Sequence, residues 1–202
     1  VAARHLRRSF FRLPEVESRY PNLGMTVAAV ADLPDLEADI GRSISPRGDV
    51  LDSASLELGR IRRAIRVAHN RLNERLQSMI SGRLGGAVQD AIITSRDGRY
   101  VIPIKADARS QVPGVVHDTS ASGQTLFIEP LEIVELNNKW REEQIAEQRE
   151  IDRILDVLSD AVGTKAAALR QSVESVAALD LAMAKARLAF DLRANRPRLW
   201  TG

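Results

Sequence analysis

Cysteine is absent from this 202-residue sequence, and aromatic residues are scarce, with 2 Trp, 2 Tyr and 4 Phe. Without thiols the chain can form neither disulfides nor thiolate metal sites. A core must therefore rely on Leu, Ile, Val and Ala, which favours packed helices over a β-sandwich. No apolar run reaches the roughly 18 residues that a membrane span needs, so we expect no membrane contact and a cytoplasmic protein. Because the chain opens on Val1 and not on Met, we also expect a piece of a longer protein.

A large net charge is also lacking, because the formal net charge is +2, but the charges are unevenly distributed. Residues 1–83 carry 14 basic and 10 acidic groups, whereas residues 84–130 carry 4 and 5. Residues 60–75 hold six Arg and one Glu, and residues 131–162 hold nine acids and four bases. The first of these segments could bind nucleic acid, but pairing with the acidic segment is the favoured interpretation.

Apolar residues recurring at steps of three and four predict long helices. Ser53 or Ser55 would cap the first helix, which would run for about 28 residues and end at Gly82. A second would begin at Pro130 and stop at Gly163, and a third would end before Pro197. The apolar faces of the three helices are Leu58, Ile61, Ile65, Ala68, Leu72, Leu76 and Met79; Ile133, Leu136, Trp140, Ile145, Ile151, Ile154, Leu155, Leu158 and Val162; and Leu169, Val173, Val176, Leu179, Met183, Ala186 and Phe190.

Between the first two helices the pattern changes to short β-strands. β-Branched residues on both sides of Asp97-Gly98 predict a hairpin with a two-residue turn. The segments PGVVHD and TLFI predict two further strands. The two long helices should then run antiparallel along a shared apolar seam, with this small sheet inserted at their far end.

The stretch HDTSASGQTLFIEP, residues 117–130, contains residue types that hydrolases use. His117 and Asp118 are neighbours in a strand, so their side chains point to opposite faces and cannot form the acid–imidazole couple of a catalytic triad. A phosphate-binding loop is disfavoured because a strand, and not a helix, follows Gly123. A turn satisfied by its own Ser and Thr side chains, or hydroxyls that donate to phosphates, both remain open. Three acids at helical spacing, Glu129, Glu132 and Glu135, are interpreted as complementing a helix dipole and not as a metal site.

The stretch DGRYVIPIK, the stretch HDTSASGQTLFIEP and the following ELNN closely resemble, in this order, the central region of the MutS family. They are similar to its second bacterial branch, whose members usually end in a small nuclease domain. LDLAMAKARLAFDLRANRP resembles the family's final helix before the ATPase domain. The resemblance covers nearly the whole chain and implies a mainly α fold of core helices, two long lever helices and a small antiparallel β clamp at their tip.

The resemblance also implies how the chain is divided. Two core segments would enclose the lever and clamp, and the second would lead to an ATPase domain outside this sequence. The expected segments are 1–52 (core), 53–83 (outgoing lever helix), 84–130 (clamp), 131–162 (returning lever helix) and 163–202 (core).

The resemblance implies, for the longer protein, an ATP-driven homodimer that engages duplex or branched DNA and suppresses recombination. A role on collided ribosomes is also implied. ATP and Mg²⁺ would bind outside this chain, so no cofactor, metal or catalytic residue is assigned within it, and no enzyme activity is expected of it. From their positions in the clamp, the expected DNA-contacting residues are Arg96, Arg99, Lys105, Arg109 and Gln111. The alternative function is a helical module whose β tip contacts protein or the ribosome.

Overall fold

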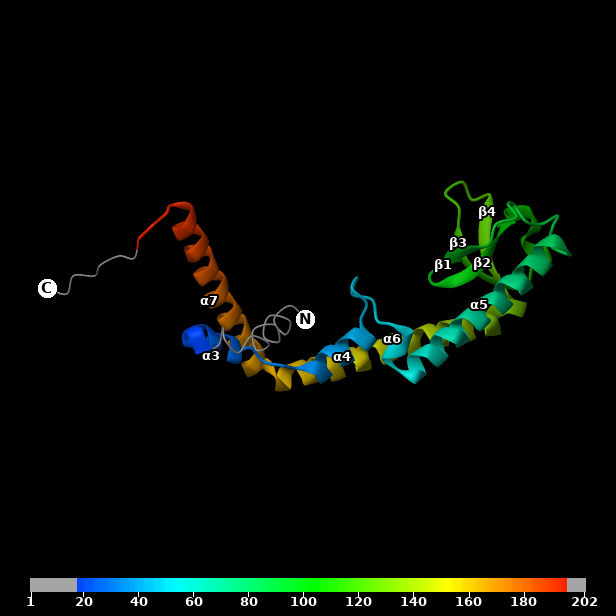
Figure 1. The fold of residues 1–202 in the computed structure, drawn as a ribbon. Helices are drawn as coiled ribbons and strands as arrows, with labels where there is room; N and C mark the ends of the chain where they lie inside the picture. Colours follow the sequence, from blue (N-terminus) through cyan, green and yellow to red (C-terminus); the bar gives the residue numbers. More distant parts are fainter. Residues whose placement is uncertain (1–17, 196–202) are drawn as a thin grey trace. The chain divides into compact units, whose positions relative to one another are not determined.

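The computed structural model describes residues 18–195, and its contacts divide the chain into two compact units (Figure 1). One unit is Ser43–Leu155, and the described residues outside that range form the other. The fold is mainly α with one small four-stranded antiparallel sheet, which confirms the predicted fold class.

The first long helix, α5, spans Leu56–Ser81 and has 26 residues. Its N-cap is Ser55, whose side chain accepts a hydrogen bond from the Leu58 amide at 2.9 Å. Its C-cap is Gly82, whose amide donates to the Ser78 carbonyl. Both ends are therefore set by local sequence signals, and the predicted length was too long by two residues.

The second long helix, α6, spans Val134–Thr164, and within the Ser43–Leu155 unit it runs antiparallel to α5. Three side-chain pairs join α5 and its N-cap to the returning segment: Ser55 with Glu150 at 2.6 Å, Arg62 with Glu147 at 2.7 Å, and Arg75 with Glu132 at 2.6 Å. Residue numbers rise along one side and fall along the other, as an antiparallel pair requires. The predicted pairing of the arginine-rich helix with the acidic segment is thus confirmed for Arg62 and Arg75.

The sheet has the strand order β1-β2-β4-β3, and every neighbouring pair is antiparallel. Its strands are β1 (Thr94–Arg96), β2 (Arg99–Lys105), β3 (Gly114–Thr119) and β4 (Thr125–Pro130). Asp97 and Gly98, at φ 51° and 73°, form the turn between β1 and β2. Two positive φ angles are the signature of the hairpin turn that Asp-Gly favours, so the predicted hairpin is confirmed. A 3-10 segment, η2 (Ala106–Gln111), leads from β2 to β3.

One hydrophobic core joins the sheet to the second half of α5. Its buried side chains come from α5, the loop after it, β2, η2, β4 and the 3-10 turn η3 (Leu131–Ile133). They are Leu72, Leu76, Met79, Ile80, Leu84, Ala87, Val88, Ile102, Ile104, Ala108, Val112, Ile128 and Ile133. The sheet and the helix therefore share their buried apolar surface, and removing the sheet would expose the helix face beneath it.

The expectation that α6 begins at Pro130 was wrong. Pro130 has the extended angles φ −61° and ψ 142°, and it pairs with Gly114 as the last residue of β4. The next amide, that of Leu131, donates to the Pro113 carbonyl, and η3 separates the strand from the helix. Sheet pairing holds Pro130 extended, although its fixed φ would equally suit a helix start.

The expectation that Gly163 stops this helix was also wrong, because α6 continues to Thr164. A helical glycine costs only about 1 kcal/mol relative to alanine, which a long helix tolerates. The break occurs at Lys165, which has φ −105° and ψ 6° and caps the next helix, α7 (Ala166–Asp191). This third helix was predicted, whereas Pro197 and residues 1–17 lie outside the described part of the chain.

The other unit contains α3 (Pro21–Ala28), most of α4 (Pro34–Ser43), the last turns of α6, and α7. The Ala31 amide donates to the Ser172 hydroxyl at 2.8 Å, which ties the loop after α3 to α7. Among the described residues, no helix is both long and apolar enough to cross a membrane.

Replacing glycine by alanine should change the stability in opposite directions at two positions. At Gly114 an added Cβ would lie near the Glu129 carbonyl oxygen and the Ile128 side chain, closer than van der Waals contact allows, whereas at Gly163 it would meet open space. Gly114→Ala should destabilise by about 1–3 kcal/mol through overpacking. Gly163→Ala, its matched control, should stabilise by up to about 1 kcal/mol through helix propensity. Urea unfolding followed by circular dichroism measures both; shifts of the same sign would contradict the assigned environments.

The environment of the Glu150 carboxylate should make the stability of the fold depend on pH. Hydrogen bonds from Arg153 and then Ser55 lower the pKa of Glu150 from 4.5 to about 2. A lowered folded-state pKa gives stability that is present above about pH 4.5 and lost as the pH falls toward 2. Because Arg153 is largely exposed, solvent screening should limit this contribution to about 1–2 kcal/mol.

The measurement is urea unfolding of the wild type and of Glu150→Gln between pH 2 and pH 5. The wild type should lose more unfolding free energy over this range than the variant does. Glu142→Gln, an exposed carboxylate on the same helix, is the control and should behave like the wild type. Parallel profiles for the wild type and Glu150→Gln would contradict the assignment.

Candidate nucleic-acid interface

A buried carboxylate fixes the sheet to α6. Glu129, near the end of β4, has only 2% of its surface exposed. Its oxygens accept hydrogen bonds from Arg99 Nη1 at 2.7 Å, from His117 Nε2 at 2.6 Å and from Asn137 Nδ2 at 2.8 Å. The donors come from β2, β3 and α6. The sequence-based assignment of Glu129 to a helix N-terminus was therefore wrong, because this residue belongs to a strand. We call Glu129 and its donors Arg99, His117 and Asn137 the joint.

Asn137 extends this joint, and its side chain is fully buried. Its Oδ1 accepts from the Tyr100 amide at 3.0 Å, and its Nδ2 donates to the Tyr100 carbonyl at 3.0 Å. The side-chain amide thus pairs with strand β2 much as a neighbouring strand would. The next residue, Asn138, accepts from Arg99 Nη2 at 2.8 Å. Consecutive asparagines at the start of α6 therefore hold consecutive residues of β2.

An aromatic cluster completes the joint from the side of α5. Tyr100 Oη lies 2.8 Å from His69 Nε2, and the Tyr100 and Trp140 ring centroids are 4.9 Å apart. Burial raises the pKa of the Tyr100 hydroxyl, so it stays neutral and can donate to the imidazole. Strand β2, α5 and α6 meet at this one tyrosine.

The histidine–acid pair of the joint does not have the arrangement of a hydrolase site. His117 and Asp118 do not couple, as predicted: His117 binds Glu129, and Asp118 accepts from Arg96 at 2.9 Å. The Glu129 carboxylate is shared with two further donors, as expected for a structural group. Within residues 18–195, no hydrogen bond joins His117 to a Ser or Thr hydroxyl, so the pair lacks the nucleophile that acyl transfer requires.

Metal binding is also not indicated, because the described residues contain no group of three His, Asp or Glu side chains arranged to hold a metal ion. The third acid of the sequence pattern, Glu132, forms ion pairs with Arg75 and Arg83.

Three of the five expected DNA-contacting residues lie at the surface of the sheet and η2. Arg96 donates to Asp118, and its guanidinium carbon lies 3.9 Å from the Phe127 ring centroid. Lys105 makes one long hydrogen bond of 3.3 Å to the Gly86 carbonyl, which leaves its ammonium able to bind another acceptor. Gln111 is exposed at the end of η2. DNA contact by these residues stays a prediction.

The other two expected residues are half-buried and donate hydrogen bonds to acceptors within the fold. Arg99 binds Glu129 and Asn138 in the joint. Arg109 donates to the Val112 carbonyl at 2.8 Å and to the Gly114 carbonyl at 3.0 Å. Two of the five residues thus spend their donors on acceptors of the fold itself. Sequence reasoning missed the joint itself, although the apolar strand around Glu129 could have indicated that this acid needed buried donors.

Comparisons with known proteins identify the family, although no protein-family model matches the chain. Endonuclease MutS2 of Thermomicrobium roseum is 57% identical over 198 residues, which cover 98% of this chain and 25% of that protein. Endonuclease MutS2 of Symbiobacterium thermophilum is 43% identical over 192 residues, covering 95% and 24%. That of a Geobacillus species is 42% identical over 197 residues, covering 97% and 25%. The chain belongs to the second bacterial branch of the MutS family.

This MutS-family chain spans about a quarter of the length of these curated relatives. The motifs that carried the resemblance are the ones that build the joint. Arg99 and Tyr100 belong to DGRYVIPIK, Glu129 is the penultimate residue of the second stretch, and Asn137 and Asn138 end ELNN. Their shared role in the structure is to attach the sheet to the long helices.

Removing the asparagine at the centre of the joint gives a direct test. Asn137→Ala would leave the amide and carbonyl of Tyr100 unsatisfied and take one donor from Glu129. The expected loss is about 2–4 kcal/mol of unfolding free energy, because several buried polar groups lose partners at once. Urea unfolding followed by the fluorescence of Trp140, in a Trp200→Phe background, measures it. Asn70→Ala, an exposed substitution on α5, should cost less than about 0.5 kcal/mol; equal effects of the two variants would refute the role of the joint.

Proposed function

We propose that this chain is the clamp and lever region of a MutS-family DNA repair or recombination protein of the cytoplasm. It holds duplex or branched DNA through contacts to the sugar–phosphate backbone, without reading base sequence. The clamp is the sheet with its loops, residues 84–130, and the lever is the pair α5 and α6.

The observation that carries this proposal is the joint around Glu129. A clamp that transmits movement to a lever must not rotate freely relative to it. The joint restricts such rotation because it ties the sheet to α6 through hydrogen bonds at Glu129, Asn137 and Asn138. The helix α5, about 39 Å long at 1.5 Å per residue, provides the length over which a displacement could be passed.

The surface of the sheet offers donors suited to phosphates. The Lys105 ammonium uses one of its N–H donors on the Gly86 carbonyl and can donate others to a phosphate, and Gln111 is exposed. The loop between β3 and β4 presents the hydroxyl of Ser122 and the side chain of Gln124. Such contacts position a protein on a duplex and give little sequence preference, which suits a protein that recognises DNA shape.

The longer protein supplies the rest of the proposed mechanism. We propose that ATP and Mg²⁺ bind in an ATPase domain outside these residues, that two copies form a homodimer enclosing DNA, and that the protein suppresses recombination. The relatives are named endonucleases. We assign a mechanical role to this segment, and any nuclease activity to other parts of such a protein.

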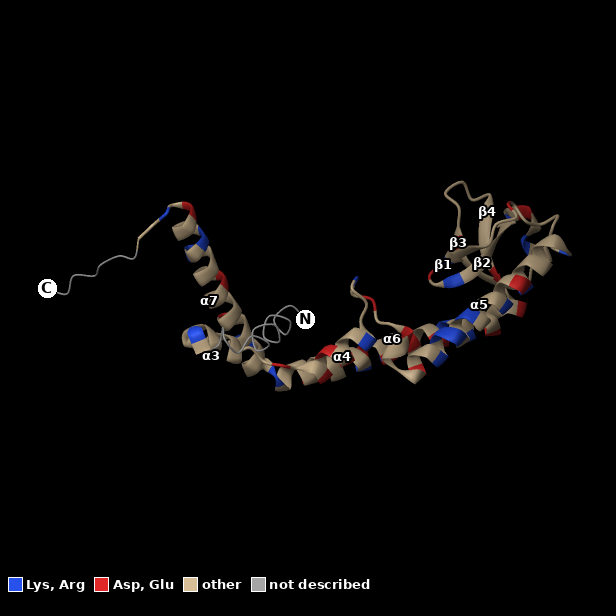
Figure 2. Ribbon diagram, viewed as in Figure 1, with Lys and Arg blue, Asp and Glu red and all other residues tan. Residues whose placement is uncertain are grey.

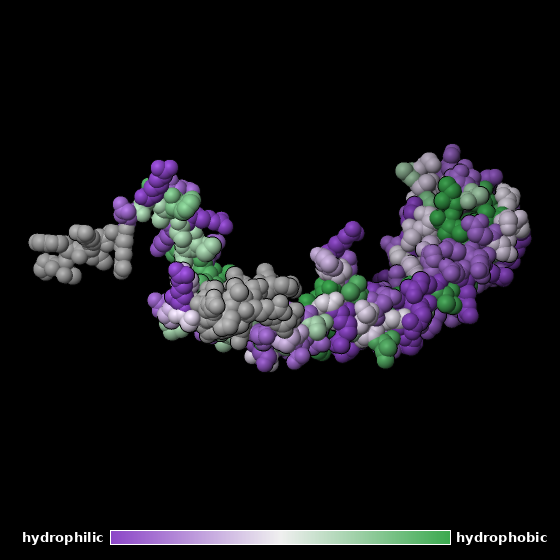
Figure 3. Space-filling view, in the orientation of Figure 1, coloured by the Kyte–Doolittle hydropathy of each residue, from purple (hydrophilic) through white to green (hydrophobic). Residues whose placement is uncertain are grey.

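A protein contact is the second candidate function, and α7 favours it. This helix exposes large apolar side chains along its length, which Figure 3 shows as a pale to green surface. They include Val173, Leu181, Met183, Leu188 and Phe190, the last with 84% of its surface exposed. Exposed apolar groups at this density are typical of a protein interface. We propose that α7 packs against protein, which is compatible with DNA binding by the other unit.

Fluorescence anisotropy of the 202-residue chain on duplex, three-way-junction and single-stranded DNA tests the proposed function. Duplex and junction should bind, and their affinity should fall as salt rises because phosphate contacts release counterions. Single strands should bind more weakly, because few exposed aromatic side chains are available for base stacking. Absence of binding to duplex and junction at low salt would refute DNA holding by this chain.

Two matched substitutions test the clamp contact. Lys105→Gln removes one phosphate-binding charge and should reduce the magnitude of the salt slope by about 0.9. Gln111→Ala removes no charge and should leave the slope unchanged while weakening binding slightly. If Lys105→Gln has the same slope as the wild type, the sheet makes no charged contact at this position.

A further inference from the structure

Three arginines of α5 are left without ion pairs after the helix pair has formed. Arg60 pairs with Glu57, Arg62 with Asp52 and Glu147, and Arg75 with Glu132. No ion pair within residues 18–195 involves the other three arginines of this segment, Arg63, Arg66 and Arg71, and all three are exposed. Figure 2 shows the basic residues concentrated along α5.

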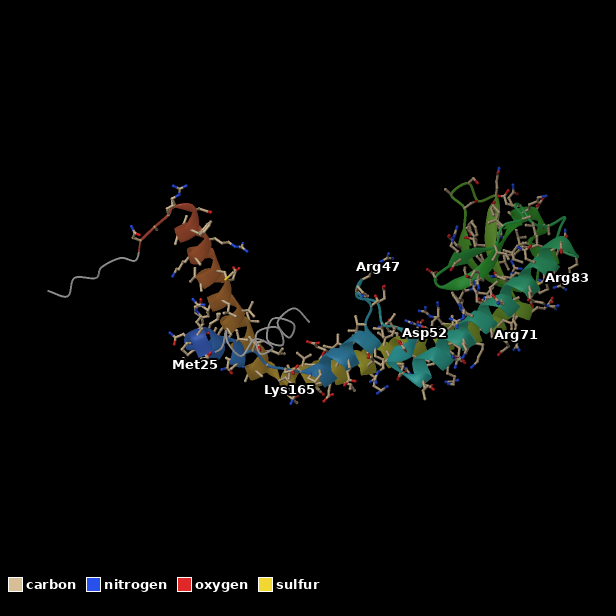
Figure 4. The ribbon with its side chains drawn as sticks, viewed as in Figure 1. Met25, Arg47, Asp52, Arg71, Arg83 and Lys165 are labelled. Carbon is tan, nitrogen blue, oxygen red and sulfur yellow. The ribbon has the colours of Figure 1, made fainter. Side chains whose placement is uncertain are left out.

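The three residues share the side of α5 that faces away from its core. The helix buries Leu58, Ile61, Leu72 and Leu76, whose positions repeat at helical spacing. At 100° per residue, Arg63 falls opposite the centre of that buried stripe, with Arg66 and Arg71 to either side of it. Arg63 and Arg71 are separated by about 12 Å along the helix axis. Figure 4 labels Arg71 on this helix.

Nearby carboxylates neutralise this surface only in part. Within α5 the acidic residues are Glu57, which is paired with Arg60, and Glu74. Across the groove on α6, Glu143 is paired with Lys139 at 2.8 Å. Asp52, just before α5, binds Arg62 and also interacts electrostatically with Arg63 and Arg66. Glu74 and this shared carboxylate thus face the three arginines Arg63, Arg66 and Arg71. We call these three arginines the arginine face.

We propose that the arginine face binds the phosphates of a nucleic-acid duplex, and that it carries more of the charge-dependent affinity than the basic residues of the sheet. This inference rests on the proposed function and deepens it by naming a second contact surface. Guanidinium groups bind phosphate oxygens through paired N–H donors, and such contacts need no base recognition. The sheet contributes less because Arg99 and Arg109 already donate to acceptors inside the fold.

An acidic protein helix is the competing occupant, and the surface fits it less well. A docked helix buries an apolar stripe as well as charges. The exposed large apolar residues of α5 are Val67, at 50%, and Leu56 at the start of the helix. Val67 faces an open groove of about 340 Å³ between α5 and α6, with Ala64 and Leu136 in its wall. Arg63 and Arg71 line the same groove, so its apolar part is small and is flanked by charge. The exposed side of α5 is mainly hydrophilic in Figure 3, which suits a phosphate backbone better.

The test uses the full 202-residue chain and a triple variant, Arg63→Gln, Arg66→Gln and Arg71→Gln. Glutamine keeps helix propensity and length while removing charge. The matched control, Arg149→Gln, Arg170→Gln and Arg187→Gln, removes the same charge from exposed positions on α6 and α7. Circular dichroism and the urea midpoint confirm that both variants fold like the wild type. Anisotropy on fluorescein-labelled duplex DNA and duplex RNA is then measured over roughly 50–200 mM salt.

For duplex DNA, the slope of log affinity against log salt should lose about 2.7 in magnitude in the triple variant, since each phosphate contact contributes about 0.9. The control should keep the wild-type slope. A triple variant with the wild-type slope, while Lys105→Gln loses part of it, would overturn the arginine face and leave the proposed function standing. Absence of wild-type binding to duplex DNA would overturn the proposed function. If, in that case, duplex RNA binds the wild type and its salt slope is smaller in the triple variant, the arginine face would be a binding surface for duplex RNA.

A last arm addresses the competing occupant. The probe is a labelled synthetic helix of repeated Glu-Leu-Ala-Glu-Leu-Glu-Ala heptads, which combines acidic flanks with an apolar stripe. Both proteins should bind it weakly, the triple variant somewhat more weakly because it has lost three positive charges, and duplex binding should fall much more than peptide binding. If the triple variant loses peptide binding but keeps duplex binding, the arginine face is a protein-docking surface and the phosphate proposal is overturned.

Discussion

The Ser43–Leu155 unit depends on the solvation of one buried carboxylate. A charged group removed from water is costly unless hydrogen bonds and opposite charge replace its hydration. Glu129 obtains that replacement from Arg99, His117 and Asn137, which lie on three different elements. The carboxylate is satisfied only when β2, β3, β4 and α6 hold their observed positions. The same bonds that stabilise the charge therefore fix the orientation of the sheet on α6.

This constraint also determines which charges remain for binding. The basic groups of the sheet look like phosphate contacts when the sequence is considered alone, but the joint uses Arg99, and Arg109 holds backbone carbonyls. On α5, pairing with the acidic return segment occupies Arg62 and Arg75. The arginines of α5 that remain are Arg63, Arg66 and Arg71, and they define the part of this helix that a polyanion would meet. Sequence clusters of charge thus indicate binding surfaces only after the internal partners have been subtracted.

Local signals were sufficient for much of the fold. The Ser55 cap, the Asp97-Gly98 turn and the apolar periodicity of α5 each depend on residues close in sequence, and charge balance indicated the antiparallel pairing. Pro130 and Gly163 were misassigned because distant pairing with Gly114 in one case, and the tolerance of a long helix in the other, outweighed their local preferences. The role of Glu129 could not be derived, since its donors come from three elements whose meeting is a property of the whole fold. The family resemblance added the clamp and lever architecture, and the joint gives a physical reason for the motifs that carried it.

The joint holds the sheet in one orientation on α6. Because the chain contains no cysteine, two spin labels can be placed without background, at Val115→Cys on β3 and Arg149→Cys on α6. Pulsed electron paramagnetic resonance would then measure the distribution of distances between them in the otherwise unchanged chain and with Asn137→Ala added. We expect one narrow distribution in the first protein and a clearly broader one in the second. A broad distribution in the unchanged joint, or equal widths in both proteins, would contradict the claim.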